Sequence, residues 1–274
     1  MNDITCITLY YGRKALAEEA VESFLRQTYP HKHLVIVNTH PDPLYFEKEY
    51  ENIEVHNRQA SEFANLNEKY NYALAQIKTK WFCPWDSDDL GLPWHLKNLV
   101  ENIPNVQGNG KPIKIGYPMS LFSLDNKIKK LGWQMWADCI FEVTRKIQCD
   151  SNNTMNCDRQ IVYKNSWNRF WLRIKDYPIP SFIFRRFMAA DNASLWLGKK
   201  GQQFVKELYK KVSAIPIKEP MRPHWDRDYV KDAEDFMKTL RESHYNTRYI
   251  LKNPRRIAEA NKVIAAKKAL EKRN

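Results

Sequence analysis

The stretch WFCPWDSDDL, residues 81–90, carries three carboxylates directly after an apolar run. Its first five residues are bulky and apolar, which is typical of a buried strand. Asp86, Asp88 and Asp89 follow within four positions. In an open α/β sheet, ligands bind beyond the carboxyl ends of the strands, so a turn at this position is a candidate binding site.

Carboxylates that lie this close together repel one another unless a cation neutralises them. Mg²⁺ and Mn²⁺ prefer oxygen ligands, and commonly combine one or two carboxylates with the phosphates of a nucleotide. One interpretation is therefore a divalent ion that bridges the protein and a diphosphate. The other is a solvated acidic turn that caps the next helix, since Asp is favoured at helix N-termini. The tetrapeptide alone favours the second interpretation, because short motifs often occur by chance.

The segments that precede this turn alternate between predicted strands and helices. Short apolar runs over residues 4–10, 33–37 and 53–56 predict buried strands, and residues 14–27 and 59–77 carry apolar side chains at helical spacing. This order is typical of a mostly parallel sheet with helices on both faces. The predicted fold class is therefore α/β.

Beyond residue 90 the pattern is less regular. It predicts further helices and strands, but not their order in a sheet. The predicted helices cover residues 93–100, 158–167 and 226 onward, and the predicted strands cover residues 113–121, 125–131 and 180–184.

The composition predicts a folded protein with a basic surface. Of 274 residues, 43% are hydrophobic and 13% aromatic, which supplies a core and excludes disordered and fibrous classes. There are 44 Lys and Arg against 32 Asp and Glu, a net charge of +12. This excess points to a polyanionic partner such as nucleic acid, anionic lipid or a phosphorylated ligand. The alternative is a basic surface that only keeps the protein in solution.

The cysteines and the N-terminus predict a cytoplasmic protein. Five irregularly spaced cysteines without a CxxC motif indicate reduced thiols. We expect no signal peptide at Met1, and no run of eighteen apolar residues predicts a membrane span.

Five segments, in order, resemble the nucleotide-sugar-binding half of the GT-A fold, family 2-like glycosyltransferases. They are residues 4–13 (ITCITLYYGR), 23–30 (SFLRQTYP), 33–37 (HLVIV), 70–75 (YNYALA) and 81–90. Each segment is a weak match alone, but they follow one another in the order of that family, and the region that they span is about a third of the chain. The resemblance therefore favours the metal interpretation of the acidic turn. It implies a Rossmann-like GT-A fold with a helical basic C-terminal extension.

This resemblance implies a domain division and a donor site. Residues 1–225 would form the catalytic domain, with a nucleotide-sugar half, 1–100, and an acceptor half, 101–225; residues 226–274 would form the extension. Asp88, assisted by Asp86, would ligate Mn²⁺ or Mg²⁺. The residues implied to contact a UDP-sugar are Tyr10, Tyr11, Gly12, Arg13, Asn38, Lys69, Asn71, Asp86 and Ser87.

The same resemblance implies a downstream carboxylate that acts as general base in inverting members. Asp158 occupies that stretch and is our candidate, with Asp138 and Asp150 as alternatives; Asp158 could equally cap a helix. The family often carries two Asp after the second strand, where this chain has Asn38, Thr39 and His40. A late His that completes the metal site in some members corresponds to Asn192, beside Asp191.

Basic and aromatic residues alternate between residues 159 and 186, a mixture that suits nucleic acid. The alternative is an ordinary core under a charged surface. Together with the basic tail over residues 251–274, this segment resembles phage enzymes that glycosylate hydroxymethylated pyrimidines in DNA, which would act in the host cytoplasm. The residues predicted to contact the acceptor are Arg159, Lys164, Trp167, Arg169, Trp171, Arg173, Arg185 and Arg186.

The predicted function is thus metal-dependent, inverting transfer of a sugar from a UDP-sugar to hydroxymethylated DNA, with no protein partner. A polysaccharide, lipid-linked or protein acceptor is one alternative, and the tail could bind anionic lipid. The other is a non-catalytic nucleic-acid-binding protein on the same scaffold.

Overall fold

The computed structural model describes residues 2–103, 113–116, 119–132, 136, 138–143, 148–149, 168–171, 179–186, 210–212 and 214–242. The elements of its first hundred residues alternate between strands and helices, as predicted. They are β1 Ile4–Tyr10, α1 Lys14–Leu25, β2 Lys32–Asn38, β3 Ile53–Asn57, η1 Ala60–Glu62, α2 Leu66–Ala75, β4 Trp81–Pro84, β5 Leu90–Gly91 and α3 His95–Glu101.

The second part of the chain contributes mainly strands. They are β6 Ile113–Gly116, β7 Ser120–Leu124, β8 Lys127–Gly132, β9 Cys139–Glu142, β10 Asn168–Trp171 and β11 Phe182–Arg186, followed by the helix α6 Tyr229–Glu242.

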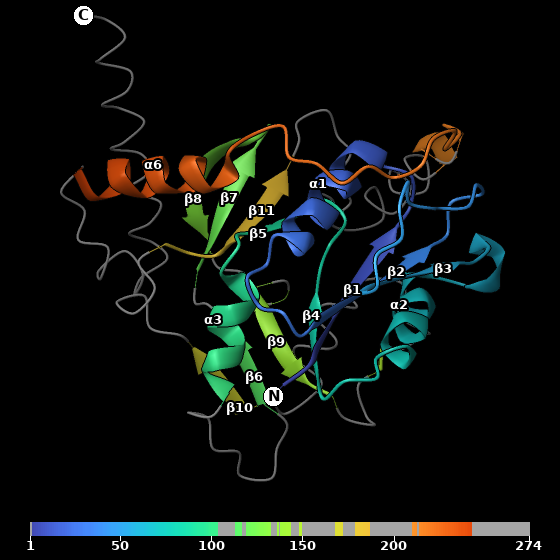
Figure 1. Ribbon diagram of the computed structural model, residues 1–274, viewed down its shortest axis with the longest axis horizontal. Helices are drawn as coiled ribbons and strands as arrows, with labels where there is room; N and C mark the ends of the chain where they lie inside the picture. The colour runs from blue at the N-terminus through green and yellow to red at the C-terminus, as the bar shows by residue number, and fades with distance from the viewer. Residues whose placement is uncertain are drawn as a thin grey trace, which may run out of the picture.

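A seven-stranded sheet in the order β10-β6-β9-β4-β1-β2-β3 forms the centre of the molecule (Figure 1). Strands β4, β1, β2 and β3 are parallel, and β9 is inserted antiparallel between β4 and β6. The mostly parallel α/β sheet is therefore confirmed.

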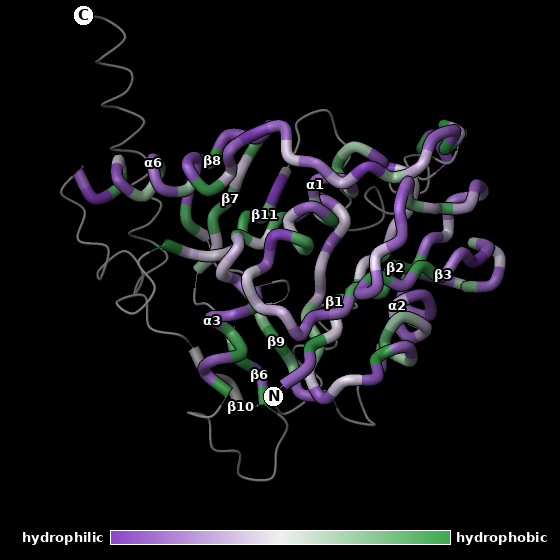
Figure 2. The backbone as a smooth tube through the Cα atoms, viewed as in Figure 1, coloured by the Kyte–Doolittle hydropathy of each residue, from purple (hydrophilic) through white to green (hydrophobic). Residues whose placement is uncertain are grey.

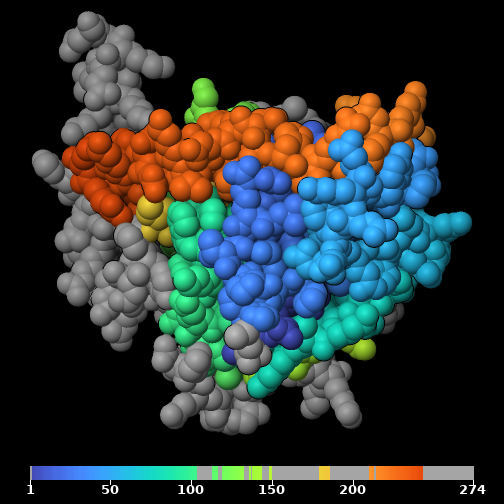
Figure 3. Space-filling model, viewed as in Figure 1, coloured from blue at the N-terminus to red at the C-terminus, as the bar shows by residue number. Residues whose placement is uncertain are grey.

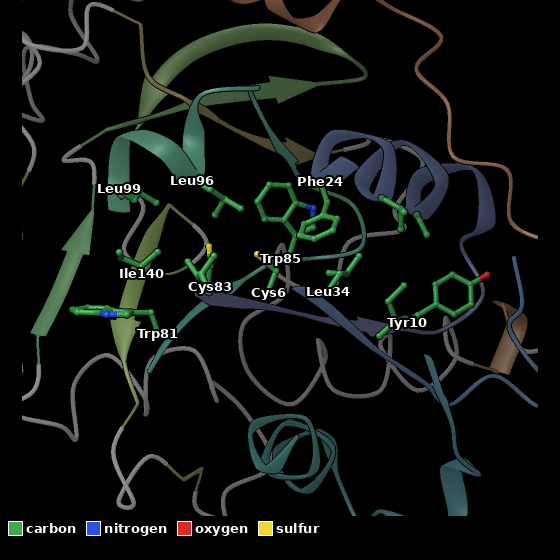
Figure 4. Close-up of a cluster of buried hydrophobic side chains, with 14 of the residues drawn as sticks. Cys6, Tyr10, Phe24, Leu34, Trp81, Cys83, Trp85, Leu96, Leu99 and Ile140 are labelled. Carbon is green, nitrogen blue, oxygen red and sulfur yellow. The ribbon is translucent and has the colours of Figure 1, made fainter. Parts of the chain in front are cut away.

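The sheet is buried on both faces because its strands are apolar on both. Side chains alternate along a strand, so Ile4 and Cys6 of β1 pack with α1 and α3, while Ile7 packs with α2. Figure 1 shows α1 and α2 on opposite sides of β1 and β2. Figure 4 shows the first of these clusters, in which Phe24 of α1 meets Trp85 edge to face at 5.9 Å between ring centroids.

A second sheet in the order β5-β11-β7-β8 is covered by α6. The apolar residues Tyr229, Ala233, Met237 and Leu240 recur every three or four positions and face this sheet. The predicted C-terminal helix is confirmed over α6, which packs against the rest of the protein. Residues 243–274, with the basic tail, lie outside the described residues.

The segment over residues 214–228 crosses the surface before α6. Figure 2 shows it as largely hydrophilic, and Figure 3 shows it, in orange, running over α1. Two hydrogen bonds hold the backbone of this segment against the core. The Ile217 N–H donates to Asp42 Oδ2 at 2.7 Å, and the Arg222 N–H donates to Glu18 Oε1 at 2.7 Å.

Two expectations about secondary structure are wrong, and one strand was missed. The helix predicted over residues 59–77 is split into η1 and α2, because Asn65 caps α2 by accepting the N–H groups of Asn67 and Glu68. The strand predicted over residues 113–121 is divided between two sheets. The short strand β9 is absent from the prediction. The helix predicted over residues 158–167 lies outside the described residues.

The cysteines depart in part from the reduced state that we expected. Cys6, Cys83 and Cys139 are free and buried, but Cys149 is disulfide-bonded. Within the part of the chain that the structure describes, no helix has the length and apolar character needed to cross a membrane.

Gln27, from the segment SFLRQTYP, connects the first helix to the far side of the acidic turn. Its side-chain amide donates to the carbonyls of Ser23, Gly91 and Leu92 at 2.9–3.0 Å, and its oxygen accepts the Leu96 N–H at 3.0 Å. Since all of these groups are buried, the glutamine satisfies backbone polar atoms that water does not reach.

We expect Gln27→Ala to lower the free energy of unfolding by about 2–4 kcal/mol, because it leaves several buried backbone groups unsatisfied. Chemical denaturation measures this change. The control is Gln76→Ala, which removes one half-exposed bond to the Tyr72 carbonyl and should cost less than about 1 kcal/mol. Equal losses in the two variants would contradict this account of Gln27.

Candidate functional site

The carboxyl ends of four parallel strands meet at one edge of the large sheet. Tyr10 pairs with Asn38 at the ends of β1 and β2, and Asn38 pairs with Asn57 at the end of β3. On the other side of β1, Ile7 pairs with Pro84, the last residue of β4 before the acidic turn. The topology therefore brings the residues that follow these strands to a single edge, where ligands bind in open α/β sheets.

The turn between β1 and α1 requires glycine. Gly12 has φ +85°, and a Cβ atom there would lie 2.7 Å from His40 Cδ2 and 2.9 Å from Val212 Cγ1. Arg13 is the N-cap residue of α1. The backbone N–H groups at a helix N-terminus favour anions, so this turn suits a phosphate group.

The acidic turn is anchored to the core by its neighbour Trp85. The Trp85 N–H donates to the Ile7 carbonyl at 2.8 Å, and its indole Nε1 donates to the Ala20 carbonyl at 2.9 Å. Asp88 is 8% exposed, and its Oδ2 accepts from Arg13 Nη1 at 2.9 Å. The structure thus brings Arg13 and Asp88, both predicted as site residues, into direct contact.

Asp89 and Arg185 hold the other side of the turn. The Arg185 N–H donates to Asp89 Oδ1 at 2.7 Å, and its guanidinium Nε donates to the Asp88 carbonyl. The same guanidinium pairs with Glu19 of α1 and donates to the Leu16 carbonyl at 3.2 Å.

Glu19 extends this network to the C-terminal helix. Its Oε1 accepts from the Tyr229 hydroxyl at 2.6 Å, and burial together with this hydrogen bond raises the pKa of the phenol. The turn is therefore linked through Arg185 and Glu19 to α1 and to α6.

Arg185 does not fit the predicted contact with an acceptor. It is fully buried and its guanidinium is bonded to α1 and to the acidic turn. A side chain in this position supports the site from within. Arg186 follows it at the end of β11, where the structure describes the backbone alone.

Lys69 reaches from α2 to the ends of β1 and β2. Its Nζ donates to the Tyr10 carbonyl at 3.0 Å and to Thr39 Oγ1 at 2.5 Å, and lies 5.6 Å from the centroid of the Tyr11 ring. Burial lowers the pKa of the Lys69 amine to about 7, because it penalises the charged form. Lys69 therefore lies at the edge of the sheet where the strands β1 and β2 end.

Asn38 and Asn71 use their side chains within the protein. Asn38 is fully buried; its amide donates to the Asp42 carbonyl and to Asn57 Oδ1, and its oxygen accepts the His40 N–H. The Asn71 amide bonds both backbone groups of Cys149, at 2.7 and 2.9 Å. These contacts give both residues a role in holding loops, in place of the UDP-sugar contact that we expected.

Asp138 is unsuited to act as the alternative general base. Although burial raises its pKa to about 7, the side chain is fully buried and accepts a hydrogen bond from Ser120 at 2.8 Å, so it presents no exposed oxygen to an acceptor hydroxyl. Arg169 and Trp171 belong to β10, whose backbone pairs with β6. The remaining acceptor-side predictions lie outside the described residues: Asp150, Asp158, Asp191, Arg159, Lys164, Trp167 and Arg173.

Four residues of this edge and its support were not singled out from the sequence. His40 follows β2 beside Gly12, and Thr39 bonds Lys69. Glu19 accepts hydrogen bonds from Arg185, which holds the acidic turn, and from the Tyr229 hydroxyl. Glu19 and Arg185 are separated by 166 positions, so no local pattern indicates their contact. For His40 the sequence offered one signal, namely that it follows the second strand, where the resembling family often carries Asp.

The donor set of the acidic turn suits a hard divalent cation in one respect. Asp86 and Asp88 offer carboxylate oxygens, which Mg²⁺ and Mn²⁺ prefer. Within the described ranges, no group of three or more His, Cys, Asp or Glu side chains could hold a metal ion. Asp86 and Asp88 are thus the residues that would hold such an ion, with substrate phosphate and water completing its shell.

Comparison with known proteins identifies the fold. No protein-family model and no curated protein matches the chain. Residues 1–349 of S. aureus TarS match with TM-score 0.50 at 12% identity, over 84% of this chain and 68% of that chain. The complex of that fragment with UDP-GlcNAc matches with TM-score 0.50 at 11% identity, over 90% and 72%.

The chain covers 43% of a longer TarS structure, with TM-score 0.48 at 11% identity over 90% of this chain. At such identities the likeness establishes the architecture. The protein has the GT-A glycosyltransferase fold, as predicted.

Loss of the Arg185 guanidinium should destabilise the protein strongly. We expect Arg185→Met to lower the free energy of unfolding by about 3–5 kcal/mol, since it leaves the Glu19 carboxylate buried without its cation. The control is Arg222→Met, which breaks an exposed ion pair with Glu47 and should cost no more than about 1 kcal/mol. Urea denaturation at neutral pH compares them; a similar small loss in both would contradict the assigned role of Arg185.

Proposed function

We propose that the protein is a glycosyltransferase that transfers a sugar from a UDP-sugar to a hydroxyl group. The observation that carries the proposal is the acidic turn, Asp86 to Asp89, held against Arg13 at the N-terminus of α1. Carboxylates beside a helix N-terminus combine a cation site with a phosphate site, which a nucleoside diphosphate needs. The fold supports this, because the matching TarS structure is a complex with UDP-GlcNAc.

The donor would lie along the edge formed by β1, β2 and β4. The diphosphate would contact the Gly12–Arg13 backbone at the start of α1, and Arg13 would exchange its bond with Asp88 for one with a phosphate oxygen. When bound at Asp86 and Asp88, Mn²⁺ or Mg²⁺ supplies Lewis-acid stabilisation of the leaving diphosphate. Ser87 and Tyr11 are further proposed donor contacts, and Lys69 is proposed to lie near the phosphate.

The acceptor that we propose is a hydroxymethylated pyrimidine in DNA, with Asp158 as general base and inversion at the sugar. A net charge of +12 supports a polyanionic acceptor. In the sequence, six Lys and Arg besides the buried Arg185 stand against one Asp between residues 159 and 186, interspersed with Trp, Tyr and Phe. Such a mixture supplies phosphate contacts and stacking surfaces for a base that leaves the duplex.

Nucleoside mass spectrometry tests this proposal. DNA that contains 5-hydroxymethylcytosine or 5-hydroxymethyluracil is incubated with the protein, Mn²⁺ and a panel of UDP-sugars, and then digested. We expect a mass gain of one sugar on the modified nucleoside. Asp88→Asn should lower the rate at least about 100-fold, because the turn loses a charged ligand. Asp235→Asn, on the exposed face of α6, is the control and should retain the rate.

Two results separate the parts of the proposal. Release of UDP from one donor without any modified nucleoside would reject the DNA acceptor and keep a glycosyltransferase. The search would then turn to glycan, lipid-linked and protein acceptors. Absence of both UDP binding and UDP release with every donor would reject the glycosyltransferase and leave a binding protein on this fold.

Arg13 and a divalent cation should compete for Asp88. We expect Arg13→Met to bind Mn²⁺ several-fold more tightly without nucleotide, since the cation no longer displaces the Arg13–Asp88 pair, which contributes about 1 kcal/mol. The same variant should bind UDP about tenfold more weakly, because a phosphate contact is lost. Electron paramagnetic resonance of free Mn²⁺ measures the first effect.

The control for Arg13 is Arg26→Met, which removes an arginine at the opposite end of α1, where it pairs with Glu22. It should leave Mn²⁺ and UDP affinities unchanged. Unchanged Mn²⁺ affinity in Arg13→Met would show that Asp88 does not bind the cation.

A further inference from the structure

Among the residues that the structure describes, Lys69 is a buried amine without an acidic partner at the proposed donor edge. Its Nζ donates to two neutral oxygens, the Tyr10 carbonyl and Thr39 Oγ1. Both acceptors are uncharged, and burial lowers the pKa of the amine because it penalises the ammonium form. A buried ammonium group is costly until an anion pairs with it.

His40 adds a second buried donor on the same edge. Its side chain is fully buried, and Nδ1 accepts the Asp42 N–H at 3.0 Å. The proton of the neutral ring therefore lies on Nε2, which has no hydrogen-bond partner in the structure. The Nε2 edge faces Gly12, because a Cβ atom on Gly12 would lie 3.2 Å from Nε2.

These two donors approach the same turn from different elements. Lys69 bonds the Tyr10 carbonyl, and the Tyr11 ring lies 6.3 Å from the His40 ring and 5.6 Å from Lys69 Nζ. The family that this chain resembles often has acids after β2, whereas this chain has Thr39 and His40. An edge that offers donors and a cation selects a ligand rich in acceptor oxygens and negative charge.

The other titratable groups on the surrounding elements have partners or stay uncharged near neutral pH. Burial raises the pKa of the Tyr10 phenol, so it remains neutral. Glu68, on α2, accepts the Ala64 N–H at 2.7 Å. The titratable and charged groups that the described contacts place around Lys69 and its bonding partners are Tyr10, Tyr11, Arg13, His40, Asp42 and Glu68.

We propose that Lys69 and His40 form a subsite for the diphosphate of the donor, and that the Lys69 amine takes up a proton from solvent when the nucleotide binds. This inference rests on the proposed function and adds to it a proton-linked mode of recognition. The negative phosphate stabilises the ammonium form, so it raises the pKa of the bound amine above that of the free amine.

The sign of the pH dependence follows from this order of pKa values. The free amine has a pKa of about 7, so at pH 8 it is mostly neutral. The bound amine is charged at pH 8, and each nucleotide therefore brings in close to one proton. Affinity should fall about tenfold per pH unit above pH 7.5, until the pH passes the pKa of the bound amine, and should be flat below pH 7.

Isothermal titration calorimetry with UDP and Mn²⁺ at pH 8.0 tests the proposal. Titrations in buffers of different ionisation enthalpy count the protons exchanged, and at this pH the UDP phosphates are already ionised. We expect uptake of about 0.5–1 proton per UDP in the unaltered protein. Lys69→Arg, which is always charged, and Lys69→Met, which never is, should both abolish the uptake. Circular dichroism verifies that the variants are folded.

His40→Gln is the matched control, because it removes the other donor of the subsite and leaves the Lys69 amine in place. It should keep the proton uptake and bind UDP several-fold more weakly. UDP binding without proton exchange in the unaltered protein would overturn the inference and leave the proposed function intact. Uptake that survives in Lys69→Met and disappears in His40→Gln would also overturn it. A protein that binds no UDP would fail the proposed function itself.

Discussion

The buried guanidinium of Arg185 connects the parts of the structure that define the candidate site. It joins β11 to the acidic turn through the Asp88 carbonyl, and to α1 through Glu19 and the Leu16 carbonyl. Glu19 also accepts from Tyr229 at the start of α6. A buried ion pair adds little net stability over a packed apolar pair, but loss of one partner is costly. The network therefore fixes one arrangement of turn, helix and second sheet.

This arrangement gives Asp88 and Asp89 different roles. Asp89 is turned inward and accepts the Arg185 N–H, so it holds the turn. Asp88 is directed to the sheet edge and is neutralised by Arg13. The edge thus carries carboxylates near β4 and cationic or donor groups near β1 and β2. A nucleoside diphosphate with a divalent cation matches this separation, because the cation meets the acids and the phosphates meet the donors.

Local pattern was sufficient for the parallel core of the fold. The apolar runs of β1, β2 and β4 are long enough to identify strands, and the place of Asp86–Asp89 after β4 follows directly from them. The roles of Arg185, Asn38 and Asn71 could not be predicted, since their partners are distant in the sequence or belong to loops. The same holds for Cys149, whose disulfide the irregular cysteine spacing did not indicate. The sequence does not distinguish an exposed basic residue from a buried one, which is why it predicts that Arg185 contacts the acceptor.

We propose that a nucleoside diphosphate and a divalent cation bind together at this edge of the sheet. A crystal structure of the protein with UDP and Mn²⁺, with anomalous data collected for manganese, tests it most directly. We expect an anomalous peak beside Asp88, with the pyrophosphate between it and the Gly12–Arg13 backbone and with Arg13 turned away from Asp88. Nucleotide and manganese bound elsewhere, or UDP at the edge with the Arg13–Asp88 pair unbroken, would contradict it.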